Sequence, residues 1–255
     1  MRRWTFVICL NFLAIGCGRR GDLQTLPSPS GQAAVTTNDY PAVVKVVGHE
    51  GRGLCTGTFV SERAVLTAAH CTRDDGAYSV ISQFGVHVTY DKFNLGPGVV
   101  DDPEDVSILI FDENVASRAE GQVLNIGRDP QQGDLVRLVG FGCNDIDSRK
   151  GSGVKRTGTN QIYSIDDYLV LLTPLSAPSV KGILGPENRA GSCFGDSGGP
   201  ALRGSGTALE VVGIAHAGGT SKDNQLSEYV NLTRPSVRNF LSYINRTYAL
   251  SLVGF

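Results

Sequence analysis

This sequence of 255 residues is short of three things: net charge, long apolar runs and clustered metal ligands. Its formal net charge is −2, which gives no reason to expect nucleic acid as a partner. The apolar run at residues 4–15 is too short to span a bilayer by itself. No cluster of metal-binding residues is apparent in the sequence, so we expect neither a metal nor another cofactor.

What the chain does contain is typical of a globular β protein. Apolar residues make up 41% of the chain, charged residues make up 19%, and glycine occupies 32 positions. Short apolar runs are separated by turn signals, which indicates an all-β sandwich or barrel. The runs lie at 42–47, 65–66, 86–90, 106–111, 135–139, 168–172 and 209–214. Near the end of the chain, apolar residues recur at helical spacing, so residues 235–245 are predicted to form an amphipathic helix.

The most informative segment is the glycine-rich stretch 191–200, Gly-Ser-Cys-Phe-Gly-Asp-Ser-Gly-Gly-Pro. Gly195, Gly198 and Gly199 surround Ser197, and glycine adopts backbone conformations that other residues resist. This freedom allows backbone N–H groups, which we assign to Gly195 and Ser197, to converge where an oxyanion would form. A serine alone is a poor nucleophile, so the interpretation also needs a base and a group that orients the base.

Candidates for both partners precede Ser197 in the chain. His70 lies in a small-residue turn that follows the apolar run 64–66, which indicates a buried strand. Asp105 stands at the start of another apolar run, where its carboxylate can be buried against an imidazole N–H. Asp101 and Asp102 are competing acids, although a solvated acidic loop is the simpler interpretation of both.

Residues 195–199 also match the pattern G-x-S-x-G, the nucleophile turn of α/β-hydrolases. An esterase of that fold is therefore an alternative that must be tested against the rest of the chain. In that fold the acid and the histidine follow the serine. Here the only histidine after Ser197 is His216, and no alternating strand–helix pattern surrounds it. Residue order and fold class therefore exclude the esterase.

Three blocks of sequence, in the order His, Asp, Ser, resemble the trypsin/chymotrypsin family of serine peptidases. They are residues 55–71, which hold two cysteines sixteen apart, 105–109 and 193–200. The resemblance covers roughly residues 41–244 and implies two packed six-stranded antiparallel β-barrels with a C-terminal helix. It also implies a serine endopeptidase with a triad formed by His70, Asp105 and Ser197. A catalytically silent member that serves as a binding protein, and a lipoprotein with a structural role in the envelope, are the alternatives.

The resemblance also places a primary specificity pocket. The residues expected to form it are Gly191, Ser192, His216, Gly218 and Ser227. Because glycine stands at position 191, where trypsin-like enzymes carry an aspartate, a Lys or Arg side chain would be buried without a countercharge, which is costly. We therefore expect a preference for apolar or aromatic residues. Glu228 would reverse this expectation if a shift of one residue placed its carboxylate in the pocket.

Position 216 carries two hypotheses. The family usually has a small hydroxyl residue there, which is hydrogen-bonded to the acid of the triad. The side chain of His216 could bond Asp105 in its place, or it could favour an acidic side chain of the substrate.

Two further features are compared with the family pattern. The resemblance favours a Cys55–Cys71 disulfide, and the remaining pair, Cys143–Cys193, departs from the pattern because no cysteine follows Ser197.

Asp196 matches the acid that pairs, in the family, with the amine of a newly cut N-terminus. Residues 29–32 are nevertheless Pro-Ser-Gly-Gln and not the usual Ile-Val-Gly-Gly. Cleavage at an atypical site and maturation without cleavage therefore both remain open.

The N-terminal residues indicate export. Residues 1–16, with two arginines before an apolar run, are interpreted as a signal peptide of the lipoprotein type. The run ends in Leu-Ala-Ile-Gly-Cys, which resembles a bacterial lipobox, and acyl chains on Cys17 would anchor the chain. An ordinary cleavage site with a coincidental cysteine is the alternative. Residues 17–38 are expected to form a flexible tether or propeptide, and 39–255 the peptidase domain.

These features together predict a bacterial member of the family, exported to the cell envelope or secreted. An envelope location would be periplasmic or at the outer membrane. We expect a monomer that acts on protein or peptide substrates, contacts a membrane through the lipid at Cys17 and has no nucleic acid partner.

Overall fold

The computed structural model describes residues 39–48, 51, 53–99, 101–143, 149–174, 190–220 and 224–254. The segments predicted as a signal peptide and a tether, together with Cys17, lie outside the described residues. No helix within the described ranges is long and apolar enough to cross a membrane.

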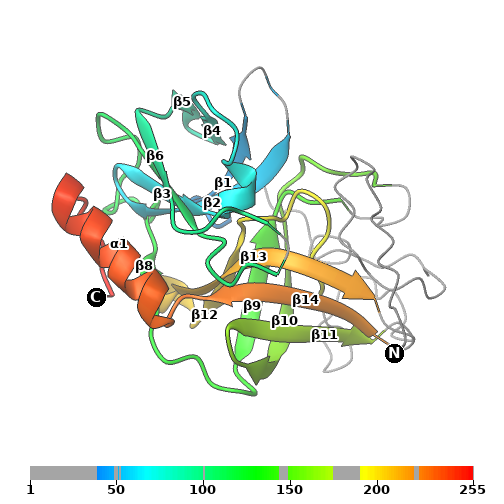
Figure 1. Cartoon of the computed structure of the whole chain (residues 1–255). Helices are drawn as coiled ribbons and strands as arrows, with labels where there is room; N and C mark the ends of the chain where they lie inside the picture. Colours follow the sequence, from blue (N-terminus) through cyan, green and yellow to red (C-terminus); the bar gives the residue numbers. More distant parts are fainter. Residues whose placement is uncertain are drawn as a thin grey trace, which may run out of the picture.

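The first half of the chain forms one sheet, drawn in blue to green in the upper part of Figure 1. Its seven strands follow the order β5-β4-β1-β2-β3-β7-β6. All of their pairings are antiparallel, and valine is frequent in β1, as suits a pleated strand. The strands are β1 (Val43–Val47), β2 (Leu54–Ser61), β3 (Ala64–Thr67), β4 (Ser79–Ser82), β5 (Gly85–Val88), β6 (Asp91–Asn94) and β7 (Ser107–Ile110).

The second half forms another sheet of seven strands, in the order β12-β9-β10-β11-β14-β13-β8. An additional pairing of β12 with β13 closes six of these strands into a barrel. The seventh strand, β8, pairs in parallel with β13. The strands are β8 (Asn125–Ile126), β9 (Leu135–Gly140), β10 (Arg156–Ile165), β11 (Tyr168–Pro174), β12 (Pro200–Arg203), β13 (Glu210–Thr220) and β14 (Asn224–Asn231).

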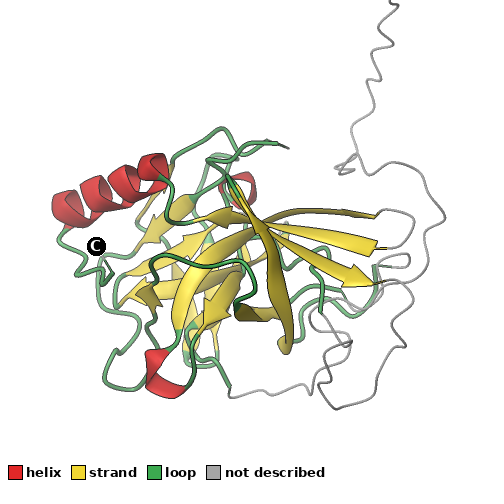
Figure 2. Cartoon of the chain, turned by 90° about the horizontal axis from the view of Figure 1, so that it is seen from below, coloured by secondary structure: helices red, strands yellow, loops and turns green. Residues whose placement is uncertain are grey.

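One α-helix, α1 (Pro235–Tyr248), follows the second sheet. It lies beside both sheets at one end of the molecule (Figures 1 and 2). Pro235 occupies its first turn, where a missing N–H costs nothing, and Ala249 ends it in the left-handed conformation. Val237, Leu241 and Ile244 recur on one face and are buried. Two short 3-10 helices, η2 (Ala69–Cys71) and η3 (Gly206–Ala208), complete the elements used below.

The predicted all-β class is confirmed, and so are the two barrel-like sheets and the C-terminal helix. The structure refines the predicted strand count because the short strand β8 joins the second sheet and the first sheet is an open layer of seven strands. β8 is also an exception to the antiparallel prediction. The helix runs three residues beyond the predicted end at Asn245.

A shared apolar core fixes the two sheets against each other. It joins Leu66 and Ile108 of the first sheet to Val139 and Ile214 of the second, and Leu241 of α1 packs into the same cluster. All five side chains are buried. Burial of apolar surface is the main favourable contribution to folding, so residues carried by different sheets are held at fixed relative positions.

Candidate active site

His70 and Asp105 meet through two hydrogen bonds. His70 lies in η2, directly after β3, and Asp105 lies just before β7, the strand that pairs with β3. The backbone N–H of His70 donates to Asp105 Oδ1 at 2.7 Å, and the His70 ring nitrogen Nδ1 lies 2.6 Å from Asp105 Oδ2. The pairing of β3 with β7 therefore brings the two residues together. The carboxylate of Asp105 then accepts from the backbone of His70 and contacts its ring.

The electrostatics of Asp105 keep its carboxylate charged. The side chain is completely buried, and burial alone would raise its pKa. Hydrogen bonds from His216 and His70, with the nearby charge of His70, outweigh this effect and lower the pKa of Asp105 to about 2. A carboxylate accepts hydrogen bonds but cannot donate them, so each imidazole presents an Nδ1–H to it. In a neutral ring held in this way, Nε2 of His70 carries no proton and can accept one.

The loop of Ser197 is packed against the strands that lead to His70. The N–H of Thr56 on β2 donates to the Ser197 carbonyl at 2.8 Å, and Gly198 N–H donates to Ala215 O at 2.8 Å. A Cβ at Gly198, where φ is +79°, would overlap Thr67 Oγ1 and the backbone of Thr56. Only glycine permits this approach, which brings residues 191–200 beside the residues that precede His70. This segment, which holds the candidate nucleophile, is called the nucleophile loop.

The competing acid Asp102 has a local role. Its two carboxylate oxygens accept from the N–H groups of Glu104 at 2.9 Å and Gly98 at 3.3 Å. Both contacts stabilise the loop that precedes Asp105. Among the acids considered, Asp105 is therefore the one that contacts His70.

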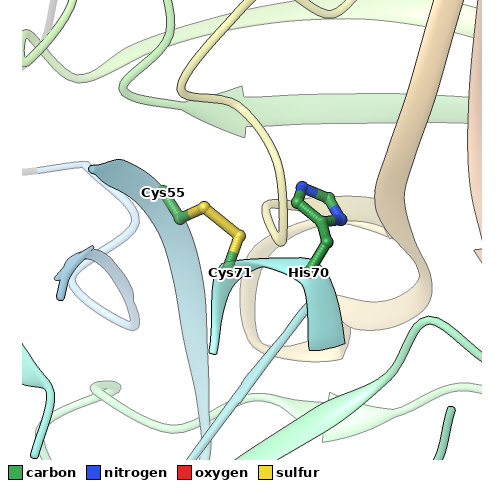
Figure 3. Close-up of side chains that lie close together, drawn as sticks. All are labelled: Cys55, His70 and Cys71. Carbon is green, nitrogen blue, oxygen red and sulfur yellow. A yellow bond between two sulfur atoms is a disulfide. The ribbon is translucent and has the colours of Figure 1, made fainter. Parts of the chain in front are cut away.

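Both predicted disulfides are present in the structure, Cys55–Cys71 and Cys143–Cys193. Figure 3 shows the first beside His70, where it links β2 to η2. The second joins the segment after β9 to the nucleophile loop. Each disulfide therefore holds a segment that carries a candidate catalytic group.

Four of the predicted pocket residues gather between the nucleophile loop and two strands. Ser192 N–H donates to Ser227 Oγ on β14 at 2.9 Å. Gly218 on β13 faces Ser227 across the strand pair and lies beside Ser192. Gly191 continues the same segment. The structure thus brings Gly191, Ser192, Gly218 and Ser227 together, although they come from three parts of the chain.

Gln225 is a member of this group that sequence reasoning missed. Its amide nitrogen donates to Ser192 O at 2.6 Å, and its side chain occupies the space where a Cβ on Gly191 would lie. The Gln225 side chain is buried, and its Oε1 atom has no partner. No local motif marks this residue, because its place beside Gly191 depends on the pairing of β14 within the sheet and on its contact with Ser192.

His216 does not line this group with its side chain, which corrects one part of the pocket prediction. Its Nδ1 lies 2.6 Å from Asp105 Oδ2, and the side chain is 2% exposed. The ring stacks on Tyr168 of β11, with centroids 5.2 Å apart. A register shift between Ala215 and Ala217 marks this point of β13. Of the two hypotheses for His216, contact with Asp105 is the one that the structure shows.

Glu228 lies on the opposite face of β14 from Ser227. Successive side chains alternate across a strand, and the Ser227 hydroxyl faces Ser192. Burial raises the pKa of Glu228, and the charge of His216 acts in the opposite direction. The carboxylate of Glu228 thus interacts electrostatically with His216 and Tyr168. The shift of one residue that would place it in the pocket does not occur.

Two groups of potential metal ligands occur in the described part of the chain, and neither has the spacing of a metal site. In the first, Cys55 and Cys71 are joined in a disulfide beside His70. In the second, the Nδ1 atoms of His70 and His216 both lie 2.6 Å from Asp105 Oδ2. Zinc ligands stand about 2.0–2.2 Å from the ion, so their atoms must lie further apart than this. The distances instead fit hydrogen bonds from the two imidazole rings to the carboxylate of Asp105.

Comparisons with known proteins agree with the fold and identify the family. The family model described as Trypsin matches residues 29–240. Snake venom serine proteinase 14 of Crotalus adamanteus is 30% identical over 185 residues, which cover 67% of this chain and 69% of that protein. Trypsin Tyr p 3.0101 of Tyrophagus putrescentiae is 26% identical over 234 residues, which cover 78% of each chain.

A solved structure supports the fold alone. It is neuropsin, a serine protease expressed in the limbic system of mouse brain, with a TM-score of 0.62 and 18% identity. The match covers 85% of this chain and 98% of neuropsin.

Proposed function

The chain belongs to the trypsin family of serine proteases, and on that premise we propose that it is an active serine endopeptidase. Its triad would consist of His70, Asp105 and Ser197. The observation that carries the proposal is the pair of hydrogen bonds from His70 to Asp105, at 2.7 and 2.6 Å. They hold the imidazole in the tautomer that a general base requires.

The chemistry follows from these positions. Nε2 of His70 accepts the Ser197 proton while the serine oxygen attacks the scissile carbonyl carbon. The N–H groups of Gly195 and Ser197 stabilise the oxyanion that forms. The imidazolium then gives its proton to the leaving amine, and an acyl-enzyme ester remains on Ser197. Water, deprotonated by His70, hydrolyses this ester and restores the serine. While His70 carries the proton taken from Ser197 or from water, Asp105 stabilises its positive charge.

Replacement of the nucleophile tests the proposal. Ser197→Ala should abolish cleavage of peptide and ester substrates and leave the thermal unfolding temperature close to that of the parent. Ser205→Ala is a matched control because Ser205 is exposed and follows β12, outside the residues placed in the site. Hydrolysis that survives in Ser197→Ala would refute the triad.

A fluorophosphonate probe distinguishes an enzyme from the alternative, a silent family member that binds proteins. The probe should label the parent at Ser197, as located by peptide mass spectrometry, and should fail to label Ser197→Ala. A folded parent that does not react would support the binding protein.

For substrates, we propose a preference for uncharged side chains. The support is the neutral environment at position 191, where the buried Gln225 amide packs against glycine and Ser227 lies nearby. A Lys or Arg side chain would find no carboxylate among these residues to offset its desolvation. Cleavage of a peptide library should therefore favour apolar or aromatic residues before the scissile bond. A profile dominated by Lys and Arg would contradict this preference.

For location, we propose export with lipid attached at Cys17. The support comes from the residues of the sequence alone, and the relatives named above are animal proteins that lend no support to a bacterial source. Mass spectrometry of the N-terminal peptide should find an acylated Cys17, and Cys17→Ala should move the protein from the membrane to the soluble fraction. An unmodified cysteine would contradict the anchor.

A further inference from the structure

We propose that Arg156 and the Cys143–Cys193 disulfide hold the oxyanion segment in its catalytic conformation, in the place of a newly cut N-terminal amine. The oxyanion segment means residues 194–197, which carry the N–H groups assigned to the oxyanion. The proposal rests on the proposed peptidase function, and it makes Arg156 a positioning residue for that reaction.

The acid of this arrangement, Asp196, is enclosed by two backbone segments. Its side chain is buried, with Oδ1 accepting from Gly142 N–H at 2.7 Å and Oδ2 accepting from Cys193 N–H at 2.9 Å. A Cβ at Gly140 or at Gly142 would overlap the carboxylate. Both oxygens are thus engaged by segments that the Cys143–Cys193 disulfide joins.

The same segments touch the oxyanion segment directly. Cys143 N–H donates to Phe194 O at 2.9 Å. A Cβ on Gly195, where φ is +100°, would lie 3.1 Å from the Cα of Gly142. Thr56 Oγ1 links the two sides, since it donates to Gly195 O at 2.8 Å and accepts from Phe141 N–H at 3.1 Å. A displacement of residues 141–143 would therefore move the Gly195 peptide.

Arg156 contacts residues 141–143 through the carbonyl of Gly142. It begins β10, where it pairs with Gly140, and it is 7% exposed. Its Nη1 donates to Gly142 O at 2.9 Å, and its Nη2 donates to Gly151 O at 2.7 Å. Gly142 is therefore held at its N–H by Asp196 and at its carbonyl by Arg156.

Arg156 also supplies positive charge to the buried acid. Burial raises the pKa of Asp196 to about 7, and hydrogen bonds from Cys193 and Gly142, with the charge of Arg156, oppose the rise. Among the described residues, Tyr229 of β14 also faces this charge: burial, together with the charge of Asp196, raises the pKa of Tyr229. In the family this carboxylate pairs with an amine, whereas here a guanidinium of the folded chain contributes the compensating charge. A catalytic conformation then requires no particular N-terminus.

The test compares Arg156→Gln and Arg156→Lys with the parent in the full-length chain. Arg203→Gln is the matched control, since Arg203 forms ion pairs with Asp134 and Glu210 in the same barrel. Arg156→Gln should lower kcat about 10²-fold, the usual effect of losing an oxyanion donor, with little change in KM. Arg156→Lys should retain more activity, and Arg203→Gln should retain the parent kcat.

The pH profile adds a readout that a purely structural role would not change. Loss of the Arg156 charge raises the pKa of Asp196 further, so the activity of Arg156→Gln should fall at a higher pH than that of the parent and should recover as pH rises above 7. If Arg156→Gln does not fold, Arg156→Lys keeps the test: its amine retains the positive charge but cannot hold both carbonyls, so it should lower kcat while keeping the pH profile of the parent.

Two further measurements complete the test. Cys143→Ser with Cys193→Ser should lower kcat in the same way. Mass spectrometry of the active protein should find no cleavage beyond removal of the signal peptide. The proposal is overturned if the parent is active while the Arg156 and disulfide variants keep its kcat and pH profile, or if activity arises only on cleavage. An inactive, correctly folded parent would instead contradict the proposed function.

Discussion

At the scale of single residues, Asp105 is the most constrained group of the site. One buried oxygen, Oδ2, accepts from two imidazoles at 2.6 Å each, and Oδ1 accepts a backbone N–H at 2.7 Å. The family pattern suggested a small hydroxyl residue at position 216, whereas this chain uses a histidine ring stacked on Tyr168. Each of these hydrogen-bond donors stabilises the negative charge of Asp105, which burial alone would disfavour.

Loss of one donor should therefore be measurable. His216→Ala leaves Asp105 short of a partner and should lower the free energy of unfolding by about 1–3 kcal/mol at neutral pH. The pKa of Asp105 is lowered from 3.8 to about 2, so its contribution is present above about pH 4 and is lost as pH falls through 2. In His216→Ala that pKa rises toward its ordinary value, so the loss of stability in acid should be smaller than in the parent and should be complete at a higher pH.

Urea unfolding midpoints between pH 2 and pH 6 measure this effect. His87→Ala is the control, since His87 packs on Phe111 and is remote from Asp105. His216→Asn keeps an N–H donor and should recover part of the loss. Equal acid sensitivity in the His216→Ala and His87→Ala variants would show that His216 does not stabilise the carboxylate.

At the scale of elements, the helix α1 completes the core shared by the two sheets. Leu241 is fully buried in that core, whereas Tyr243, two residues further on, is 61% exposed. The helix therefore contributes to the relative placement of the sheets, and with it to the placement of His70 against Ser197.

Replacement by alanine should affect the free energy of unfolding much more at Leu241 than at Tyr243. Leu241→Ala creates a cavity in the shared core and should cost about 2–5 kcal/mol of unfolding free energy. Tyr243→Ala should stay within about 0.5 kcal/mol, as is usual for exposed positions. Thermal or urea unfolding measures both. A cost for Tyr243→Ala that matches Leu241→Ala would contradict the placement of the helix.

At the scale of the whole molecule, two buried acids give stability opposite dependences on pH. The pKa of Asp196 is raised from 3.8 to about 7. Its favourable contribution is therefore complete below about pH 4 and is lost as pH rises through 7. Asp105, whose pKa is lowered, contributes above about pH 4. These two groups together place their best stability near pH 4.

Replacement of Asp196 tests this balance. Asp196→Asn cannot ionise, so the decline in unfolding free energy between pH 4 and pH 7 should become shallower than in the parent. Asp112→Asn, at an exposed position, should keep the parent slope. Urea midpoints measured across pH 4–8 check the prediction, and an unchanged slope in Asp196→Asn would mean that other groups set it.

Local patterns in the chain were enough to predict the all-β class and the helix α1, and the resemblance to the family led to the prediction of both disulfides and of the contact of Asp105 with His70. Each of these depends on short runs of residues or on blocks of known spacing, and the periodicities of strands and helices are local properties. The assignment of Ser197 as the nucleophile rests on the same kind of local pattern and stays a proposal.

Only the tertiary structure decided which distant residues share a site. His216 meets Asp105 across 111 residues, Gln225 fills the space beside Gly191, and Arg156 reaches the loop beneath Asp196. The physical reason is that strand register and bulges determine which side chain faces inward. A shift of one residue turns a side chain to the other face, and the bulge at Ala215 and Ala217 lies beside His216. Such registers result from packing of the whole sheet, which no short segment of the sequence contains.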